Sequence, residues 1–283
     1  MLLRRCRRNI FRYSVPIAFL FLYAFFQFKF SNSELRHSAS EVSARDGRRL
    51  FGDLHNDTLV DVWNLSAKDE RLVSKIKQLI EKPEKGDYNL THPDVTDFSR
   101  GQSIRINQLL DGKKRGFYIE IGASDGEDGS VSLFFERSRE WDGLLIEPHP
   151  GRYRQLRQKH RKALTLRACV RSNSSKHEKE FEDTIEGHVK IPCLWLESIL
   201  NALDKNTVDL LSVDARDQEM ELLKAIPLSK YAVNVITVEF VEGSGSDLSV
   251  MRYLLDHGYH ANHQFVNHPL HRNDMVFTRK KSS

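Results

Sequence analysis

Short apolar runs alternate with amphipathic stretches through most of the chain beyond residue 100. The runs have the length and β-branched content of buried strands and cover residues 117–121, 143–146, 164–170, 208–213 and 233–240. Between them, apolar residues recur at helical spacing in segments 131–141, 152–162, 196–203, 220–226 and 248–257. This alternation predicts an α/β fold with a doubly wound, mostly parallel seven-stranded sheet.

Two stretches of this region depart from the alternation. Lys179–Asp183 and His188–Ile191 alternate apolar and polar residues, which predicts an inserted hairpin, and Tyr259–Val266 pairs with Met275–Arg279 as a closing hairpin. Five histidines crowd this last part of the chain: His257, His260, His263, His268 and His271. A metal-binding or pH-sensing cluster is one interpretation, but the alternation favours an exposed face.

The stretch from Gly116 to Pro150 carries the clearest chemistry. After the strand at 117–121 come the small residues Gly122-Ala-Ser-Asp125-Gly126, which allow a tight turn and a close approach to a ligand. The next strand ends on Glu147, where a carboxylate can accept both hydroxyls of a ribose or simply cap the strand. Glu120, just before the turn, is placed to meet a cationic group of the same ligand.

The glycine turn lacks both the G-x-G-x-x-G pattern and the lysine of a phosphate-binding loop. It therefore favours a nucleoside without a pyrophosphate, and S-adenosylmethionine fits better than NAD. Because ligands of such sheets bind at the carboxyl ends of the strands, we expect Glu120, Glu147, Asp214 and Glu239 to converge. In a methyl transfer to an oxygen nucleophile, Asp214 is the first candidate for the base and Glu239 the second.

The N-terminus has the pattern of a membrane anchor. Five arginines within residues 1–12 precede an apolar block from Tyr13 to Phe28. We expect a cytoplasmic basic tail (1–12), a transmembrane signal anchor (13–30) and a lumenal body, which is a single-pass type II protein of the endoplasmic reticulum or Golgi membrane. A cleaved signal peptide is the competing interpretation, but the block ends without a small-x-small site.

Other counts agree with a lumenal body. N-glycosylation sequons occur at Asn56, Asn64, Asn89 and Asn173. Beyond Cys6, only Cys169 and Cys193 remain, and in an oxidising lumen they can form a disulfide, with two buried thiols as the alternative. No cysteine spacing matches a zinc site, so no metal is expected.

Residues 31–100 read as a polar stem with one amphipathic helix, at 68–81, and residues 101–283 as the α/β domain. The net charge of +4 lies largely in the N-terminal tail, and no basic patch is interleaved with aromatic residues. Nucleic acid is therefore not an expected partner, whereas the membrane is.

From Gly101 to Arg279 the chain resembles the FkbM-type methyltransferases, in the animal branch that includes the Star-like membrane proteins. The resemblance rests on GFYIEIGASDGE, WDGLLIEPHPGRYRQL, LRACV, IPCLWLESIL, VDLLSVDARDQEMELLKAI and YAVNVITVEF, in this order. It implies an S-adenosylmethionine methyltransferase fold, with Glu147 on the ribose and Glu120, Gly122, Asp125 and Gly126 on the methionine end of the cofactor. The pair Cys169 and Cys193 resembles a recurrent pair of the animal branch.

The chain departs from the family pattern after the strand at 208–213. Where the family reads Asp-Val-Glu-Gly-x-Glu, this chain reads Asp214-Ala-Arg216-Asp217-Gln-Glu219, and Val131 stands where related chains carry a polar residue. An Arg216 pointing at the pocket repels a sulfonium at about 4 Å by roughly 4 kcal/mol, whereas an Arg216 in solvent costs nothing.

Three functions follow from these residues. The first is a lumenal S-adenosylmethionine-dependent O-methyltransferase acting on a glycan, lipid or small hydroxyl compound. The second is an inactive Star-like protein that serves as a cargo or trafficking factor between endoplasmic reticulum and Golgi. The third is a membrane-tethered interaction domain that binds a different nucleoside.

Overall fold

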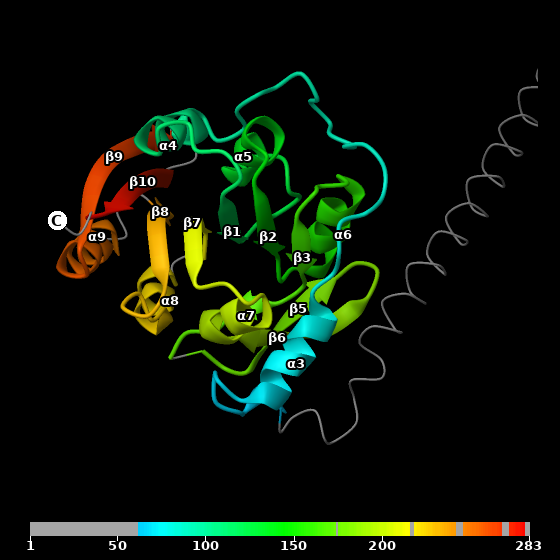
Figure 1. Ribbon diagram of the computed structural model, residues 1–283. Helices are drawn as coiled ribbons and strands as arrows, with labels where there is room; N and C mark the ends of the chain where they lie inside the picture. The colour runs from blue at the N-terminus through cyan, green and yellow to red at the C-terminus, as the bar shows by residue number, and fades with distance from the viewer. Residues whose placement is uncertain (1–61, 174, 216–217, 242–245, 268–271, 281–283) are drawn as a thin grey trace, which may run out of the picture. The chain divides into compact units, whose positions relative to one another are not determined.

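The computed structural model describes residues 62–280, apart from 174, 216–217, 242–245 and 268–271 (Figure 1). The expected basic tail, signal anchor and first half of the stem lie outside these residues, as do Asn56, Arg216, Asp217, His268 and His271. In the described part of the chain, no helix combines the length and apolarity needed to cross a bilayer.

The seven-stranded sheet predicted from the sequence is confirmed, in the order β3-β2-β1-β7-β8-β10-β9. Its strands are β1 (Phe117–Ile121), β2 (Asp142–Ile146), β3 (Leu164–Leu166), β7 (Thr207–Val213), β8 (Ala232–Val241), β9 (Tyr259–Asn267) and β10 (Arg272–Arg279). The five strands from β3 to β8 run parallel, and β10 lies antiparallel between β8 and β9. The closing hairpin expected at the C-terminus is therefore the β9–β10 pair.

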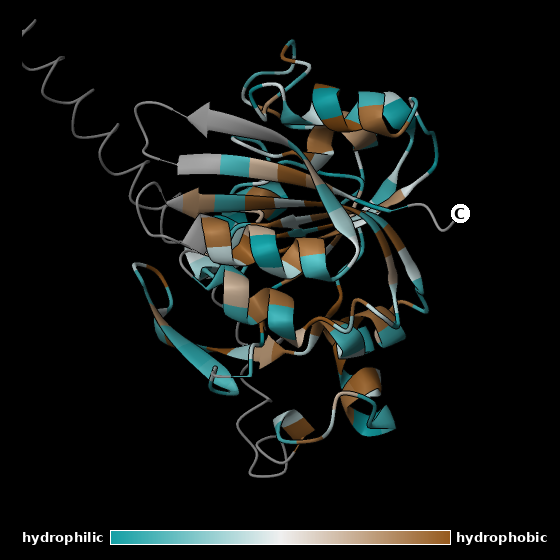
Figure 2. Ribbon diagram, turned by 90° about the vertical axis from the view of Figure 1, so that its left-hand side faces the viewer, coloured by the Kyte–Doolittle hydropathy of each residue, from teal (hydrophilic) through white to brown (hydrophobic). Residues whose placement is uncertain are grey.

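Helices cover both faces of this sheet, as its apolar runs require. The core on one face joins the strands to α3 (Glu70–Leu79), α7 (Leu196–Ala202), α8 (Glu219–Ala225) and α9 (Ser246–Asp256). The core on the other face joins them to α4 (Gln102–Leu109), α5 (Ser132–Arg139) and α6 (Pro150–Gln158). The covering helices carry both hydrophobic and hydrophilic segments, because each buries one side only (Figure 2).

The expected strand at 164–170 is two strands with different partners. β3 ends at Leu166, where Ala168 N turns back to donate to Leu166 O at 3.1 Å. β4 (Cys169–Val170) then pairs with β6 (Gly187–Leu194), which pairs with β5 (Glu178–Asp183) as the inserted hairpin predicted from the sequence. An apolar run does not reveal such a break, since both pieces are buried or half-buried.

The described half of the expected stem packs on the α/β domain. Asp69 caps α3 by accepting from Arg71 N at 2.9 Å, and α3 buries its apolar stripe against α7. Farther on, the buried Glu127 accepts from Thr91 N at 2.8 Å and His92 N at 2.7 Å. These contacts make residues 62–100 part of the folded unit and carry the chain to the edge of the site.

Candidate functional site

Two adjoining cavities open where the parallel strands end. The first, of about 290 Å³, is named the acidic cavity for its lining carboxylates Glu120, Asp128, Asp214, Glu239 and Asp274. The second, of about 360 Å³, is named the apolar cavity for its lining residues Ile146, Pro148, Ala168, Val170 and Phe181. Both volumes suit small-molecule sites. The two share Ile121, Gly122, Arg152 and Asp214, so one ligand can extend through both.

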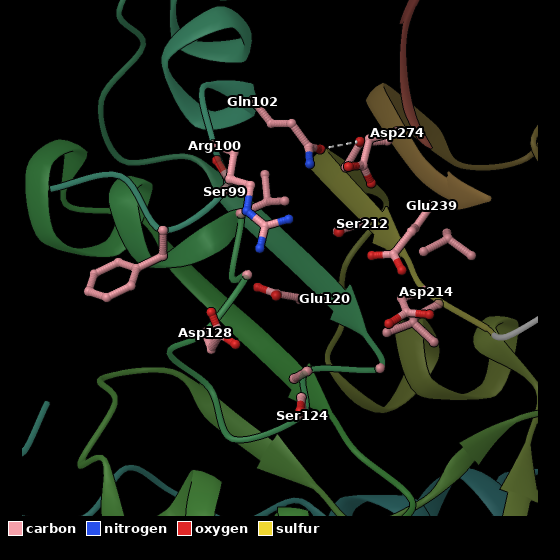
Figure 3. Close-up of a pocket in the computed structure, with 18 of the residues that line it drawn as sticks. Ser99, Arg100, Gln102, Glu120, Ser124, Asp128, Ser212, Asp214, Glu239 and Asp274 are labelled. Carbon is pink, nitrogen blue, oxygen red and sulfur yellow. Dashed lines mark hydrogen bonds between the residues drawn. The ribbon is translucent and has the colours of Figure 1, made fainter. Parts of the chain in front are cut away.

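The structure separates the four acids expected to converge into two groups. Glu120, Asp214 and Glu239 line the acidic cavity and lie around its opening in Figure 3. Glu147 lines the apolar cavity instead, and Asp214, which borders both, connects the two groups.

Gly122 forms the junction between the cavities. Its φ of +80° is left-handed, and a Cβ there would lie 2.2 Å from Asp214 O. Only glycine allows the end of β1 to lie this close to the end of β7. The junction is thus a close meeting of two backbones, and both cavities are lined by it.

Asp125 and Gly126 lie outside both cavities and shape the turn. Asp125 Oδ1 accepts from Glu127 N at 2.9 Å and Asp128 N at 3.0 Å. Gly126 has a φ of +80°, and a Cβ there would lie 2.3 Å from Leu156 Cδ1 on α6. Asp125 and Gly126 would therefore affect a bound cofactor only indirectly, by fixing the conformation of the turn.

Glu147 is held in a fixed orientation at the end of β2. The side chain is only 3% exposed, its Oε2 accepts from Ser124 N and its Oε1 from His149 N, both at 2.8 Å. A carboxylate has about four lone-pair positions, so it can accept ligand hydroxyls in addition to these two backbone groups. These two hydrogen bonds are those of a side chain that caps the strand end, which was the alternative interpretation, and the same orientation also exposes the carboxylate to the apolar cavity.

Glu120 belongs to a buried polar cluster behind the acidic cavity. Its Oε2 accepts from Ser130 Oγ at 3.0 Å, from Ser132 N at 3.2 Å and from the Ser132 hydroxyl. Burial raises the pKa of Glu120 above its ordinary value, and the positive charge of Arg161 opposes that rise. The cluster therefore decides whether Glu120 presents a charge to the cavity.

Two sources of lining residues were missed in the sequence. Asp274 pairs with Glu239 across β10 and β8 and is 8% exposed, but the register of that antiparallel pair cannot be read from the sequence. Phe98, Ser99 and Arg100 line the acidic cavity from a segment assigned to the stem.

Asp97 holds that segment by accepting from Ser99 N at 2.9 Å and Gly101 N at 2.6 Å. Arg100 between them has a left-handed φ of +55°, a conformation that is uncommon outside glycine and clusters at ligand sites. Gln102, at the start of α4, accepts from Thr237 Oγ1 at 2.9 Å, which fastens the segment to β8 (Figure 3).

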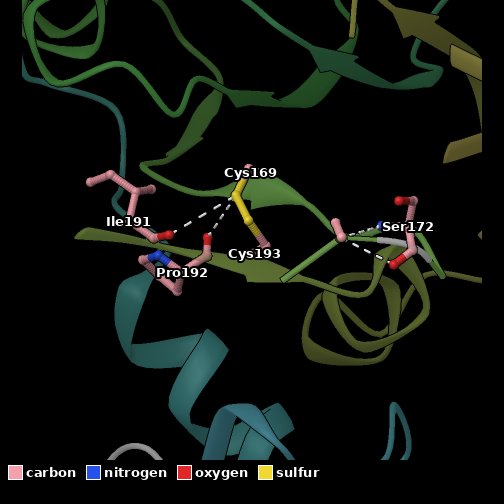
Figure 4. The surroundings of a disulfide bond; sticks show 6 residues. Cys169, Ser172, Ile191, Pro192 and Cys193 are labelled. Atoms are coloured by element: carbon pink, nitrogen blue, oxygen red, sulfur yellow. Dashed lines mark hydrogen bonds between the residues drawn. A yellow bond between two sulfur atoms is a disulfide. The ribbon is translucent and has the colours of Figure 1, made fainter. Parts of the chain in front are cut away.

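Cys169 and Cys193 form a disulfide in the wall of the apolar cavity (Figure 4). They lie opposite each other on the paired strands β4 and β6. The bond therefore fastens the inserted hairpin to the chain segment that follows β3, and this hairpin supplies Phe181 to the same wall.

The sequon asparagines that the structure describes, Asn64, Asn89 and Asn173, are all exposed. Asn89 Nδ2 donates to Gln158 O at 2.9 Å. An N-linked glycan replaces one of the two amide hydrogens, so this hydrogen bond is compatible with glycosylation.

The two cavities differ in the charged residues that line them. In the described chain the acidic cavity is lined by five carboxylates and two cations, Arg100 and Arg152, which suits a cationic or hydroxyl-rich group better than a phosphate. No group of three or more potential ligands among the described residues is arranged to hold a metal ion. The apolar cavity combines flat apolar walls with the carboxylate of Glu147.

Methyltransferases are among the solved structures to which the chain is similar. The METTL16 MTase domain has a TM-score of 0.47 and 12% identity over 74% of this chain and 91% of its own. A 1,6-didemethyltoxoflavin-N1-methyltransferase from Burkholderia thailandensis has a TM-score of 0.40 and 11% identity over 70% of this chain and 94% of its own. A TehB-like SAM-dependent methyltransferase from Corynebacterium glutamicum has a TM-score of 0.38 and 13% identity over 63% of this chain and 88% of its own.

No curated protein matches the chain with significance. A family model does: the one described as the methyltransferase FkbM domain matches residues 120–261, from Glu120 at the end of β1 to the first residues of β9. The match spans half of the chain and contains the glycine turn, Glu147, Asp214 and Glu239. The chain therefore belongs to the FkbM methyltransferase domain family.

Proposed function

We propose that this protein is a membrane-anchored, lumenal S-adenosylmethionine-dependent methyltransferase that methylates a hydroxyl of a glycan, a lipid or a small compound. The observation that carries the proposal is the Gly122 junction, where an apolar cavity with a fixed carboxylate meets an acidic one. S-adenosylmethionine has the same two halves: a flat adenosine and a charged amino-acid end joined at sulfur.

The apolar cavity suits the adenosine. Pro148, Ala168, Val170 and Phe181 offer apolar surface to a base, and Glu147 offers its oriented carboxylate to the ribose hydroxyls. Because Lys176 and Lys179 lie at the rim of this cavity, it is not acidic overall, which is consistent with an uncharged base.

The acidic cavity suits the other half of the cofactor and the acceptor. Carboxylates stabilise a sulfonium and an ammonium within a few ångströms by about 4 kcal/mol at an effective dielectric of 20. Glu120 lies on the β1 side and Glu239 and Asp274 on the β8–β10 side, so we assign Glu120 to the ammonium and the other two to the acceptor.

When bound, the cofactor would supply a methyl group made electrophilic by its sulfonium. The residues of the chain orient the acceptor hydroxyl and receive its proton. Asp214, at the junction, is the base that we favour, and Glu239 is the second candidate. Closing the cavity around the acceptor would strengthen each of these charge interactions.

The cellular setting is part of the same proposal. The basic tail and apolar block of residues 1–30 support a type II signal anchor, and a disulfide together with exposed sequon asparagines suits a lumenal domain. Peptide-N-glycosidase treatment of the protein from secretory cells is expected to lower its apparent mass, and Asn→Gln changes at Asn64, Asn89 and Asn173 identify the modified sites. An unchanged mass would contradict lumenal exposure of these sequons.

A second function is favoured by one sequence feature. Arg216 and Asp217 replace the Glu-Gly of the family pattern directly after the strand that ends near Asp214. If Arg216 points at the pocket, it weakens the binding of a sulfonium ligand by up to about 4 kcal/mol, close to a thousandfold in affinity, whereas in solvent it costs nothing. In that case the fold would serve as a non-catalytic, Star-like cargo factor between endoplasmic reticulum and Golgi.

Calorimetric titration of the purified full-length protein with S-adenosylmethionine and S-adenosylhomocysteine separates the two functions. Micromolar binding supports the methyltransferase, and no binding by a folded sample contradicts it. The matched variant Arg216→Glu/Asp217→Gly restores the family pattern. Binding gained only by this variant would favour the cargo factor, because it would assign the loss of the cofactor to these two residues.

A further inference from the structure

A fully buried arginine lies behind the acidic cavity. Arg161 stands between α6 and β3 and is only 3% exposed, and it is not among the residues that line either cavity. An arginine is rarely buried to this extent unless its charge and its donors are matched by partners.

All five N–H groups of Arg161 have acceptors. Nε lies 3.2 Å from both oxygens of Glu136, and the remaining donors reach Ser130 Oγ at 3.3 Å, Ser132 Oγ at 3.0 Å, Tyr118 OH at 3.3 Å and Gly126 O. Arginine has five donors and no acceptor, so this set is complete. One side chain thus connects the glycine turn, the start of α5 and β1.

Complete donation by Arg161 determines where the hydroxyl protons point. Ser130 and Ser132 each accept from the guanidinium, so each directs its own proton to another acceptor, which is Oε2 of Glu120. Tyr118 likewise accepts from Arg161 and donates to Glu136. Burial raises the pKa of Tyr118 well above its ordinary value, so this phenol keeps its proton.

The cluster sets the charge that Glu120 presents to the cavity. Burial alone would raise the pKa of Glu136, but Arg161 outweighs it and holds that pKa below its ordinary value. Arg161 and Glu136 therefore neutralise each other, and the serine hydrogen bonds favour the ionised form of Glu120 against burial, which raises the pKa of Glu120. Among the described residues, the hydrogen bonds to Glu120 all end on Oε2, which leaves Oε1 for a ligand in the cavity.

We propose that Arg161 is a positioning residue of the cofactor site, which acts through Ser130 and Ser132 to keep Glu120 ionised and fixed while its second oxygen faces the acidic cavity. Arg161 itself touches no ligand. The inference rests on the proposed function, since an ionised Glu120 matters most to a cationic group such as the ammonium of S-adenosylmethionine.

Other charges also face Glu120 and act on the same proton. The other carboxylates that line the acidic cavity disfavour the ionisation of Glu120, and the two arginines that line the cavity favour it. The carboxylates are Asp128 in the glycine turn and Asp214, Glu239 and Asp274 at the ends of β7, β8 and β10. The arginines are Arg100 before α4 and Arg152 on α6. The serine bridges differ from all of these, because they can be removed without changing any charge.

The test is the pH titration of the Glu120 side-chain carboxyl by carbon-13 NMR on glutamate-labelled full-length protein, with the signal assigned by its absence in Glu120→Gln. Ser130→Ala/Ser132→Ala removes two charge-stabilising hydrogen bonds, so we expect the midpoint to rise by about one pH unit or more. Ser198→Ala, which removes an equally buried hydroxyl bonded to Ala67 O, is the control and leaves the midpoint unchanged. An unchanged midpoint in the folded double variant would overturn the proposal.

Calorimetry with S-adenosylhomocysteine provides the functional arm. As the pH is lowered, the double variant is expected to lose affinity at a higher pH than wild type, by about one pH unit, because the ionised form of Glu120 is lost as the pH falls through its pKa, which the substitutions raise further. Equal pH profiles would overturn the role in cofactor binding. If the NMR midpoint shifts in the double variant but the wild-type protein binds no cofactor, the proposed function is refuted and the effect of the two serines on the ionisation of Glu120 still holds.

Discussion

The apolar cavity and the acidic cavity share Gly122 and Asp214 but are assembled in different ways. The carboxylate of the apolar cavity, Glu147, is held by two backbone groups, Ser124 N from the glycine turn and His149 N two residues along the chain. The acidic cavity draws four of its carboxylates from the ends of four strands, the fifth, Asp128, from the glycine turn, and its rim from the segment before α4. In the site that we propose, the orientation of the nucleoside-binding carboxylate thus depends on two backbone groups, whereas the acidic lining depends on how several strands are brought together.

The disulfide offers the largest effect, and it concerns the apolar cavity only. Cys169→Ser/Cys193→Ser opens a covalent loop between residues 24 apart, which is expected to lower the free energy of unfolding by about 3 kcal/mol. Denaturant unfolding of variant and wild type measures this change. If the midpoint of denaturant unfolding did not change, packing alone would hold the hairpin in the wall of the apolar cavity, and the disulfide would have no structural role there.

Glu147→Ala tests the nucleoside end of the site. Loss of charge-assisted hydrogen bonds to two ribose hydroxyls, each contributing about 1.5–3 kcal/mol, is expected to weaken the binding of S-adenosylhomocysteine by at least about 100-fold. Because 5′-methylthioadenosine has the same ribose but no amino-acid group, it is expected to lose affinity to a similar extent. Calorimetric titration of both ligands provides the measurement, and a loss confined to one of them contradicts the assignment.

Glu120→Gln separates the cavities. The amide keeps the size of the side chain but removes its charge, so S-adenosylhomocysteine is expected to bind about tenfold more weakly at neutral pH. Binding of 5′-methylthioadenosine is expected to be unaffected, because that ligand lacks the ammonium. The same titration series distinguishes the outcomes: equal losses for both ligands would place Glu120 at the nucleoside instead.

Glu239→Gln and Asp274→Asn give the smallest expected effect on the cofactor. Both residues lie on the β8–β10 side that we assign to the acceptor, so affinity for S-adenosylhomocysteine should stay within about twofold of wild type. A loss as large as that of Glu120→Gln would extend the cofactor to this side and remove the acceptor assignment.

The sequence predicted the parts of this structure that depend on local pattern. Buried apolar runs marked β1, β2, β7 and β8, and the rule for strand ends placed Glu120, Asp214 and Glu239 in one cavity. Asp274 escaped prediction because its place depends on register between antiparallel strands. The rim at Phe98–Arg100 escaped as well, since a left-handed turn held by Asp97 has no apolar periodicity to mark it.

The break between β3 and β4 shows the same limit. A single run from Leu164 to Val170 contributes strands to two sheets. Its first part pairs with β2 and its last part, at Cys169 and Val170, pairs with β6. The buried Arg161 lies inside the segment 152–162 that the sequence predicted as a helix, where it has the appearance of a surface residue, whereas α6 ends at Gln158. Its role becomes visible only through the five acceptors that distant segments supply.

A crystal structure of the protein with S-adenosylhomocysteine tests the central claim most directly. We predict the adenine between the apolar walls near Phe181, the ribose hydroxyls within hydrogen-bonding distance of Glu147, and the amino-acid end beyond Gly122 with its ammonium on Glu120. A ligand bound in the reverse direction, or one that occupies neither cavity, would contradict the account.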